Sequence, residues 1–202
     1  MNLYRSQSVA QRSRARQLGF TAIELIVVLV AIGILAVLAL RAFGVVHKTK
    51  GTVEAQNILD TVNSVQGCFG RATDFAALGA TAATGTTYVL TNCGVDTANP
   101  PSSATATEIK NQFGGSRTVA RTDIAGGSNN AVVVSNPAVP RDVCADAVQF
   151  LWDSVNVIVL TPAGGAATTV KANADQRYLP SGIAPCKTAD SVTIQVTRAK
   201  NG

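Results

Sequence analysis

The chain has 202 residues, of which 47% are hydrophobic, and a formal net charge of +5 at pH 7. Much of its Leu, Ile and Val lies in residues 20–40, whereas the remainder is rich in Ala, Thr, Gly, Asn and Val, which is typical of a small secreted domain. Four of the 17 Lys and Arg precede Phe20, which leaves 13 to face 12 acidic residues. This near-neutral balance excludes a basic face for nucleic acid.

Residues 1–19 are polar and Arg-rich, and they show no apolar periodicity. They are typical of a disordered tail or of the basic region of a targeting signal. Lys and Arg that flank an apolar segment stay on the cytoplasmic side of a membrane. We therefore expect the chain beyond residue 42 to lie outside the cytoplasm.

Residues 20–40 form an apolar run in which Glu24 is the single charge. At about 1.5 Å per residue, a helix of this length measures roughly 30 Å, enough to cross a hydrocarbon core. The run is too long for an ordinary secretory signal, and only a weak small-x-small cleavage site follows it. A plain signal anchor fits the length and the arginines, but it gives Glu24 no role.

Apolar residues continue at intervals of three and four as far as Phe69, which predicts one helix of about 48 residues. Polar residues such as Glu54 and Asp60 occupy the other positions of this pattern. Gly33, Gly44 and Gly51 each cost about 1 kcal/mol relative to Ala, so we expect the helix to bend or fray there.

The remaining residues, 70–202, predict an α+β head in which about four strands pack against a helix. Alternation is clearest in the last segment, where Val192, Ile194 and Val196 are separated by polar residues. A helix is expected over residues 142–154, with Asp142 capping its first turn, after a break at NPAVPR. Long loops are expected within residues 70–130, around two weaker strands, and a loop is expected over residues 162–174. The strands that we expect lie at residues 86–90, 117–121, 131–135, 156–160 and 191–197.

Four cysteines follow the apolar run, and no C-x-x-C is present. The even count and wide spacing favour two disulfides in an oxidising compartment over a metal site. Three pairings are possible, and we favour the sequential one, Cys68 with Cys93 and Cys144 with Cys186. In the chain-entropy model these loops contribute roughly 3.5 and 4 kcal/mol, a large share of a typical net stability of about 5–15 kcal/mol.

No catalytic constellation is found in the sequence. His47 is the one histidine, and it is best interpreted as a solvated helix residue. Asp142, Asp146 and Asp153 lack a His or Cys pattern for a metal, and the Gly-rich spots lack the context of a phosphate loop. We expect no enzyme activity, no cofactor and no metal.

Glu24 has two interpretations. A carboxylate near the membrane interface costs little, so it need have no function. Alternatively, cleavage between Gly19 and Phe20 would create an α-amine four residues before Glu24. That amine on one subunit could neutralise the carboxylate of its neighbour in a bundle of helices, where an unpaired charge is costly.

The stretch QLGFTAIELIVVLVAIGILAVLAL resembles the class III signal of type IV prepilins and type II secretion pseudopilins. The resemblance implies that a prepilin peptidase cuts after Gly19, that the new terminus at Phe20 is methylated, and that Glu24 serves assembly. NPAVPRDVCADAV and the later Cys186 are similar to the disulfide-bounded region of type IVb pilins. The domains implied are a cleaved leader (1–19), a transmembrane and filament-core helix (20–42), an amphipathic helix (43–69) and a globular head (70–202).

The family's function is then expected of this chain. The first hypothesis is a type IVb major pilin of an extracellular pilus for adhesion, bundling or conjugative mating. A minor pilin or secretion pseudopilin is the second, and a membrane-anchored periplasmic binding module that does not polymerise is the third. Expected partners are further copies in a helical filament, the prepilin peptidase and an inner-membrane assembly platform with a separate ATPase. The protein would cross the inner membrane once, with a periplasmic head, before joining the extracellular pilus.

Overall fold

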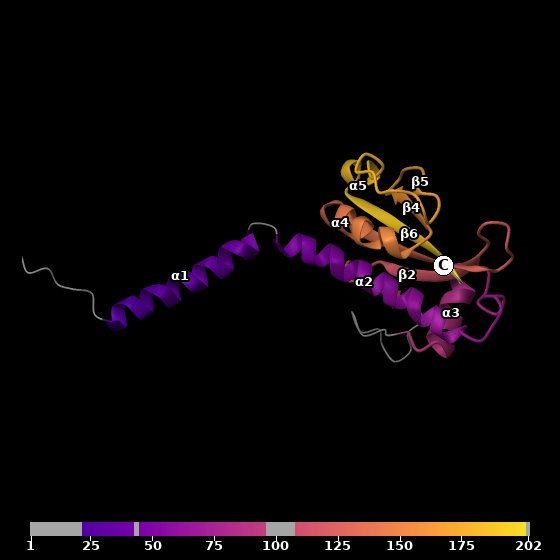
Figure 1. The fold of residues 1–202 in the computed structure, drawn as a ribbon, viewed down its shortest axis with the longest axis horizontal. Coiled ribbons are helices and arrows are strands. Elements are labelled where there is room, and N and C mark those ends of the chain that lie inside the picture. Colours follow the sequence, from indigo (N-terminus) through magenta and orange to yellow (C-terminus); the bar gives the residue numbers. More distant parts are fainter. Residues whose placement is uncertain (1–21, 43–44, 96–107, 201–202) are drawn as a thin grey trace, which may run out of the picture. The chain divides into compact units, whose positions relative to one another are not determined.

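A computed structural model describes residues 22–42, 45–95 and 108–200 (Figure 1). The chain divides into two compact units, residues 1–43 and residues 44–202. Within the described residues, the first unit consists of helix α1 (Ala22–Ala42). The second unit, called the head below, contains a sheet and its covering helices.

The predicted long helix corresponds to two helices, α1 and α2 (Val45–Cys68). Whether they are continuous depends on residues 43–44, which lie outside the described residues, as does the expected bend at Gly44. Gly33 lies within α1 and Gly51 within α2, and neither helix ends at its glycine. The prediction that the helix frays at Gly51 is therefore wrong, and a packing reason for this glycine is given below.

The described part of the head contains one antiparallel sheet of six strands, in the order β1-β2-β3-β6-β4-β5. The mixture of helices and an antiparallel sheet confirms the predicted α+β class, with more strands than expected. The strands are β1 (Ile109–Lys110), β2 (Ser116–Thr122), β3 (Ala131–Pro140), β4 (Val157–Pro162), β5 (Thr168–Lys171) and β6 (Ser191–Ala199).

The core lies between one face of this sheet and the helices α2 and α4 (Arg141–Leu151), which contact each other and both contact β3. Alternate residues of the central strands are buried, as the period of two requires. One row across three strands is Val134, Val196 and Ile158, paired in register. The head is completed by the 3₁₀ turn η1 (Trp152–Ser154), α3 (Ala82–Asn92) and α5 (Pro185–Thr188).

The predicted strand at residues 86–90 is wrong, because this segment belongs to helix α3. Its β-branched residues favour a strand, but a capping box at its start favours a helix: Thr81 accepts from the backbone of Thr84, whose side chain bonds back to Thr81. Gly85 then allows close packing, since a Cβ there would lie 2.2 Å from the carbonyl oxygen of Val119 on β2. Tertiary contact overrides the local preference.

The predicted break at NPAVPR is also wrong, because β3 continues through it to Pro140. The register shifts between Asn136 and Val139, and Ala138 has a positive φ of 60°. Such an irregularity is where a sheet tolerates proline. The strand delivers the chain directly into α4, whose N-cap is Pro140, with no side-chain cap bond. Asp142 is therefore not the cap, although its charge in the first turn favours the helix dipole.

Two short strands lie where the sequence predicts loops, and helix α5 lies within residues 175–190, for which the sequence predicts no element. β1 and β5 have two and four residues, and α5 has four. Each is too short to show a period. The predicted strands at 117–121, 131–135, 156–160 and 191–197 are confirmed within small shifts of their ends.

Candidate functional site

Helix α1 is apolar on all sides, which sets it apart from every helix of the head. Large apolar side chains along it are between 48% and 74% exposed. A helix that is hydrophobic all round normally has its surface covered. These side chains are Ile23, Leu25, Ile26, Val27, Val28, Leu29, Val30, Ile32 and Leu35.

Of the predicted processing and assembly residues, one is described. Glu24 belongs to the first turn of α1, whereas Gly19 and Phe20 lie outside the described residues. By the criteria of length and apolarity for a membrane-crossing helix, none of the helices in the described residues qualifies. The roles of Gly19, Phe20 and Glu24 thus stay predictions.

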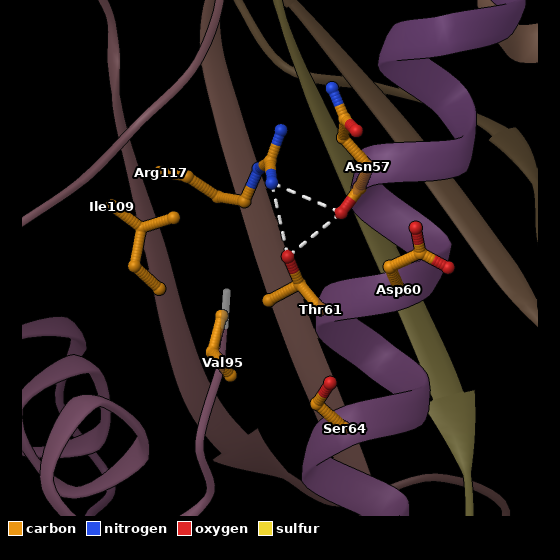
Figure 2. Close-up of a pocket in the computed structure, with 7 residues that line it drawn as sticks. All are labelled: Asn57, Asp60, Thr61, Ser64, Val95, Ile109 and Arg117. Atoms are coloured by element: carbon orange, nitrogen blue, oxygen red, sulfur yellow. Dashed lines mark hydrogen bonds between the residues drawn. The ribbon is translucent and has the colours of Figure 1, made fainter. Parts of the chain in front are cut away.

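In the head, α2 is fixed to the sheet by the buried side chain of Arg117 (Figure 2). Its Nη2 donates to Oε1 of Glu54 at 2.6 Å, and its Nη1 donates to the carbonyl of Asn57 and to Oγ1 of Thr61, both at 3.0 Å. Its Nε donates to Oδ1 of Asn136 on β3 at 3.0 Å. One guanidinium therefore joins a helix and two strands.

Both partners of this ion pair are removed from water. The side chain of Arg117 is 5% exposed and that of Glu54 is 0% exposed. Burial lowers the pKa of Arg117, while the carboxylates of Glu54 and Asp60 act in the opposite direction. An arginine nevertheless stays charged at any ordinary pH. The pair is thus a permanent buried contact.

The sequence analysis does not predict this pair, because Glu54 is interpreted there as one of the polar positions outside the apolar pattern. A signal was present, however. Glu54 is followed by the buried residues Ile58, Val62 and Val65, and the successive spacings are four, four and three residues. This spacing places Glu54 on the same face of the helix as these residues. Arg117 precedes buried Val119 by two, so it shares the core face of β2.

Asn136 and Asn111 continue the hydrogen-bond network of Arg117, and both side chains are fully buried. Nδ2 of Asn111 donates to the carbonyl of Pro137 at 2.6 Å and to Oδ1 of Asn136 at 3.3 Å. Its Oδ1 accepts from the backbone of Phe113 and Gly115. Asn111 therefore holds the β1–β2 turn against the irregular part of β3.

A small cavity of about 120 Å³ opens beside Arg117, between α2 and the start of β2 (Figure 2). The guanidinium of Arg117 already uses four of its five N–H donors within the head, and one of these bonds is to a carboxylate. No group of side chains able to hold a metal ion is found among the described residues. The cavity is lined by Asn57, Asp60, Thr61, Ser64, Val95, Ile109 and Arg117.

Two disulfides brace the head. Cys68 at the end of α2 is joined to Cys93 at the end of α3, and Cys144 on α4 is joined to Cys186 on α5. Their Cα atoms are 5.1 Å and 5.4 Å apart. This is the sequential pairing that the sequence favours, and it ties each of two helices to a later part of the head.

Comparisons with known proteins give the fold. No protein-family model matches the sequence, and no curated protein matches it. A type IVb pilin from Salmonella typhi has a similar structure, with a TM-score of 0.51 and 17% identity over 73% of this chain and 98% of that chain. TcpA, a type IV pilin from Vibrio cholerae El Tor biotype, gives 0.47 and 18% identity over 72% and 99%. The chain therefore has the fold of a type IV pilin.

Proposed function

We propose that this chain is a structural subunit of an extracellular type IV pilus, of the type IVb kind, assembled through α1. One observation carries the proposal: an apolar helix with an exposed surface belongs to the same chain as a disulfide-braced head with a type IVb pilin fold. The roles in adhesion, bundling or conjugative mating that we expected of a major pilin belong to this proposal.

The energetics of α1 favour assembly. Complete burial of one large aliphatic side chain contributes about 1.5–3 kcal/mol. Relative to water, the apolar residues exposed between Ile23 and Leu35 therefore favour a covered environment, which is the membrane before assembly and a bundle of α1 helices from several copies once the chain has left the membrane. The heads, whose cores are already closed, would then form the outer surface of the filament.

Processing would prepare this bundle. Cleavage between Gly19 and Phe20 by a prepilin peptidase, followed by methylation of Phe20, would leave a cationic terminus four residues before Glu24. In a water-poor bundle this terminus pairs with the Glu24 carboxylate of a neighbouring copy and fixes the register between them. Before assembly, the chain would be held in the inner membrane with its head in the periplasm. A separate platform and ATPase would extract it.

The first experiment examines the mature protein on cells. Sheared surface filaments should contain this chain as their main component, and mass spectrometry should find a methylated Phe20 at its N-terminus. A small cell-bound pool with the same terminus would instead favour a minor pilin or pseudopilin. An intact leader, or a cut after Ala39 or Ala42, would favour the membrane-anchored binding module.

The second experiment tests Glu24. Glu24→Ala should abolish filaments and leave processing and protein amount largely intact. Glu108→Ala is the matched control, because this carboxylate lies on the head and is half exposed. Normal filaments in Glu24→Ala cells would overturn the proposed pairing with the new terminus, though not the assignment of the chain as a pilin.

A further inference from the structure

The sheet of the head has an outer strand, β5, with β4 as its one partner among the described strands. A free strand edge carries backbone N–H and C=O groups that can pair with another chain, and proteins protect such edges by specific devices. β5 is short, and its pairing with β4 is irregular next to Ile158. Whether this edge is open therefore depends on the groups that lie on the outer side of β5.

Within the part of the chain that the structure describes, the side chain of Gln176 bonds to that side. Nε2 of Gln176 donates to the carbonyl of Val170 at 3.0 Å, and its Oε1 accepts from the N–H of Ala172 at 2.8 Å. These two backbone groups are two residues apart. In a parallel pair of strands, one residue of the neighbouring strand bonds to a carbonyl and an N–H that are spaced in this way, and it uses its own N–H and C=O. The carboxamide of Gln176 thus satisfies the edge as one residue of a seventh strand would.

The segment that carries Gln176 is fixed in place. Nε1 of Trp152 donates to the carbonyl of Gln176 at 2.7 Å, and the Trp152 ring is 4% exposed. Tyr178 packs edge-on against this ring, with centroids 5.1 Å apart. The carboxamide is therefore held against β5 by a buried aromatic group, and it is half-buried itself.

The other features of β5 offer little protection. Lys171 is its one charged residue, and this side chain is buried, donating to the carbonyls of Trp152 and Val155. The exposed side chains of the strand are Thr168 and Thr169, which are neutral and favour strands. No exposed charge on β5 would repel a second β5. Gln176 is thus the residue whose side chain satisfies the backbone groups of this edge.

On the opposite side of the sheet, β1 pairs with Ser116 and Arg117, and the part of β2 beyond them is covered in a comparable way. The N–H of Val119 on β2 donates to Oγ1 of Thr86 on α3 at 3.0 Å, and the N–H of Arg121 donates to the carbonyl of Gly79 at 3.2 Å. Helix α3 and the residues just before it therefore cover this part of β2. On the β5 edge, one side chain has that task.

We propose that the outer edge of β5 is a latent interface between two copies of this chain, and that the Gln176 carboxamide keeps it closed. The occupant is the β5 of a second copy, because two identical edges can pair antiparallel about a two-fold axis, and an antiparallel strand would bond to the Val170 carbonyl and the Ala172 N–H with two of its residues. This proposal is independent of the proposed function, since it concerns the head alone. In a crowded assembly of heads, the closed edge would prevent association in the wrong register.

The test uses the full chain in excess detergent micelles, with sedimentation analysis over a range of concentrations. Gln176→Ala removes two hydrogen bonds that compete with a second copy, so association should strengthen on the order of tenfold over wild type. Gln149→Ala, at an exposed glutamine on α4, is the matched control and should behave as wild type. Equal association of the two variants would overturn the proposal.

A second variant shows whether the edge itself is used. Adding Ala172→Pro to Gln176→Ala removes the N–H that a second strand would need, so the association should return to the wild-type level. Association that persists in the double variant would place the interface elsewhere and overturn the proposal. One measurement needs no variant: in wild type the Ala172 amide should exchange slowly with deuterium. Exchange at the rate of a free amide would contradict the closed edge.

Discussion

The carboxylate of Glu54 on α2 and the guanidinium of Arg117 on β2 meet at 2.6 Å, although 63 residues separate them in sequence. One oxygen of the carboxylate, Oε2, is buried without a hydrogen-bond partner among the described residues. A buried ion pair contributes little net stability, and loss of one partner is costly. The pair is therefore best understood as fixing where α2 lies on the sheet.

Removal of one partner should be severe. Arg117→Ala leaves the Glu54 carboxylate buried and unpaired, so the free energy of unfolding should fall by about 3–5 kcal/mol. Urea unfolding followed by fluorescence of Trp152, the one tryptophan of the chain, would measure it. Replacement of both residues, by Glu54→Leu with Arg117→Met, should recover most of the loss. A double variant no better than Arg117→Ala would contradict the interpretation.

Gly51 and Gly67 on α2 should respond to alanine with opposite signs. A Cβ on Gly51 would lie 2.8 Å from Cβ of Asp146 and 3.0 Å from the carbonyl of Val143, both on α4. The clash should outweigh the gain in helix propensity, with a net loss on the order of 1 kcal/mol. Nothing lies within 4 Å of a Cβ on Gly67, so Gly67→Ala should stabilise by up to about 1 kcal/mol. Thermal unfolding would compare them.

The two disulfides should differ in the cost of their removal. Loop entropy alone gives roughly 3.5 kcal/mol for Cys68–Cys93 and roughly 4 kcal/mol for Cys144–Cys186. Cys144 and Cys186 are also buried, at 0% and 1% exposure, so their replacement by alanine adds a packing loss. We expect the Cys144→Ala/Cys186→Ala variant to be clearly the less stable in urea. Equal midpoints would show that the buried sulfurs contribute nothing beyond loop closure.

Lys171 predicts a pH dependence. Burial lowers the pKa of its ammonium below 10.5, against the opposing effect of Asp153 and Asp175. Between the lowered pKa and 10.5, the unfolded chain binds more protons than the folded one, so the contribution of Lys171 to stability rises with pH. The free energy of unfolding of wild type minus that of Lys171→Met should therefore increase from neutral pH to pH 10.5.

Tyr178 titrates in the same range with the opposite sign. Burial and Asp146 raise its pKa above 10.0, so its contribution to stability falls as pH rises beyond that value. Because Tyr178 is present in both proteins, the comparison with Lys171→Met removes its effect. A difference that is flat, or that decreases with pH, would show that burial of the Lys171 ammonium is not felt in the folded state.

The sequence predicts an element of this fold well where residues close in sequence determine it, and poorly where contacts between distant segments determine it. Val192, Ile194 and Val196 alternate along a central strand, so local periodicity is enough to place it. In α3, β-branched residues favour a strand, and the helix is decided by a cap and by the closeness of Gly85 to β2. Contacts of that kind cannot be seen until the two segments are brought together.

The candidate site divides in the same way. The pairing of Cys68 with Cys93 could be anticipated, because loop closure favours neighbours in sequence. The ion pair of Glu54 with Arg117 is harder to predict, because the spacing of Glu54 places it on the core face of the helix whereas a polar residue in a helix usually indicates solvent. The outer-edge role of Gln176 depends on the backbone of β5, a strand too short to recognise from its residues.

The contacts of α2 with the sheet also determine how the head would carry tension. Beyond the Arg117 contact, Arg198 donates to Asn63 at 2.9 Å, and Gln66 donates to the carbonyl of Ala199 at 2.9 Å. A pull along α2 would load these attachments in shear, spread over more than two helical turns. The Cys68–Cys93 bond at the far end would stop the helix from sliding free. Resistance to tension would thus come first from several hydrogen bonds between α2 and the sheet, and then from the Cys68–Cys93 disulfide once these bonds have broken.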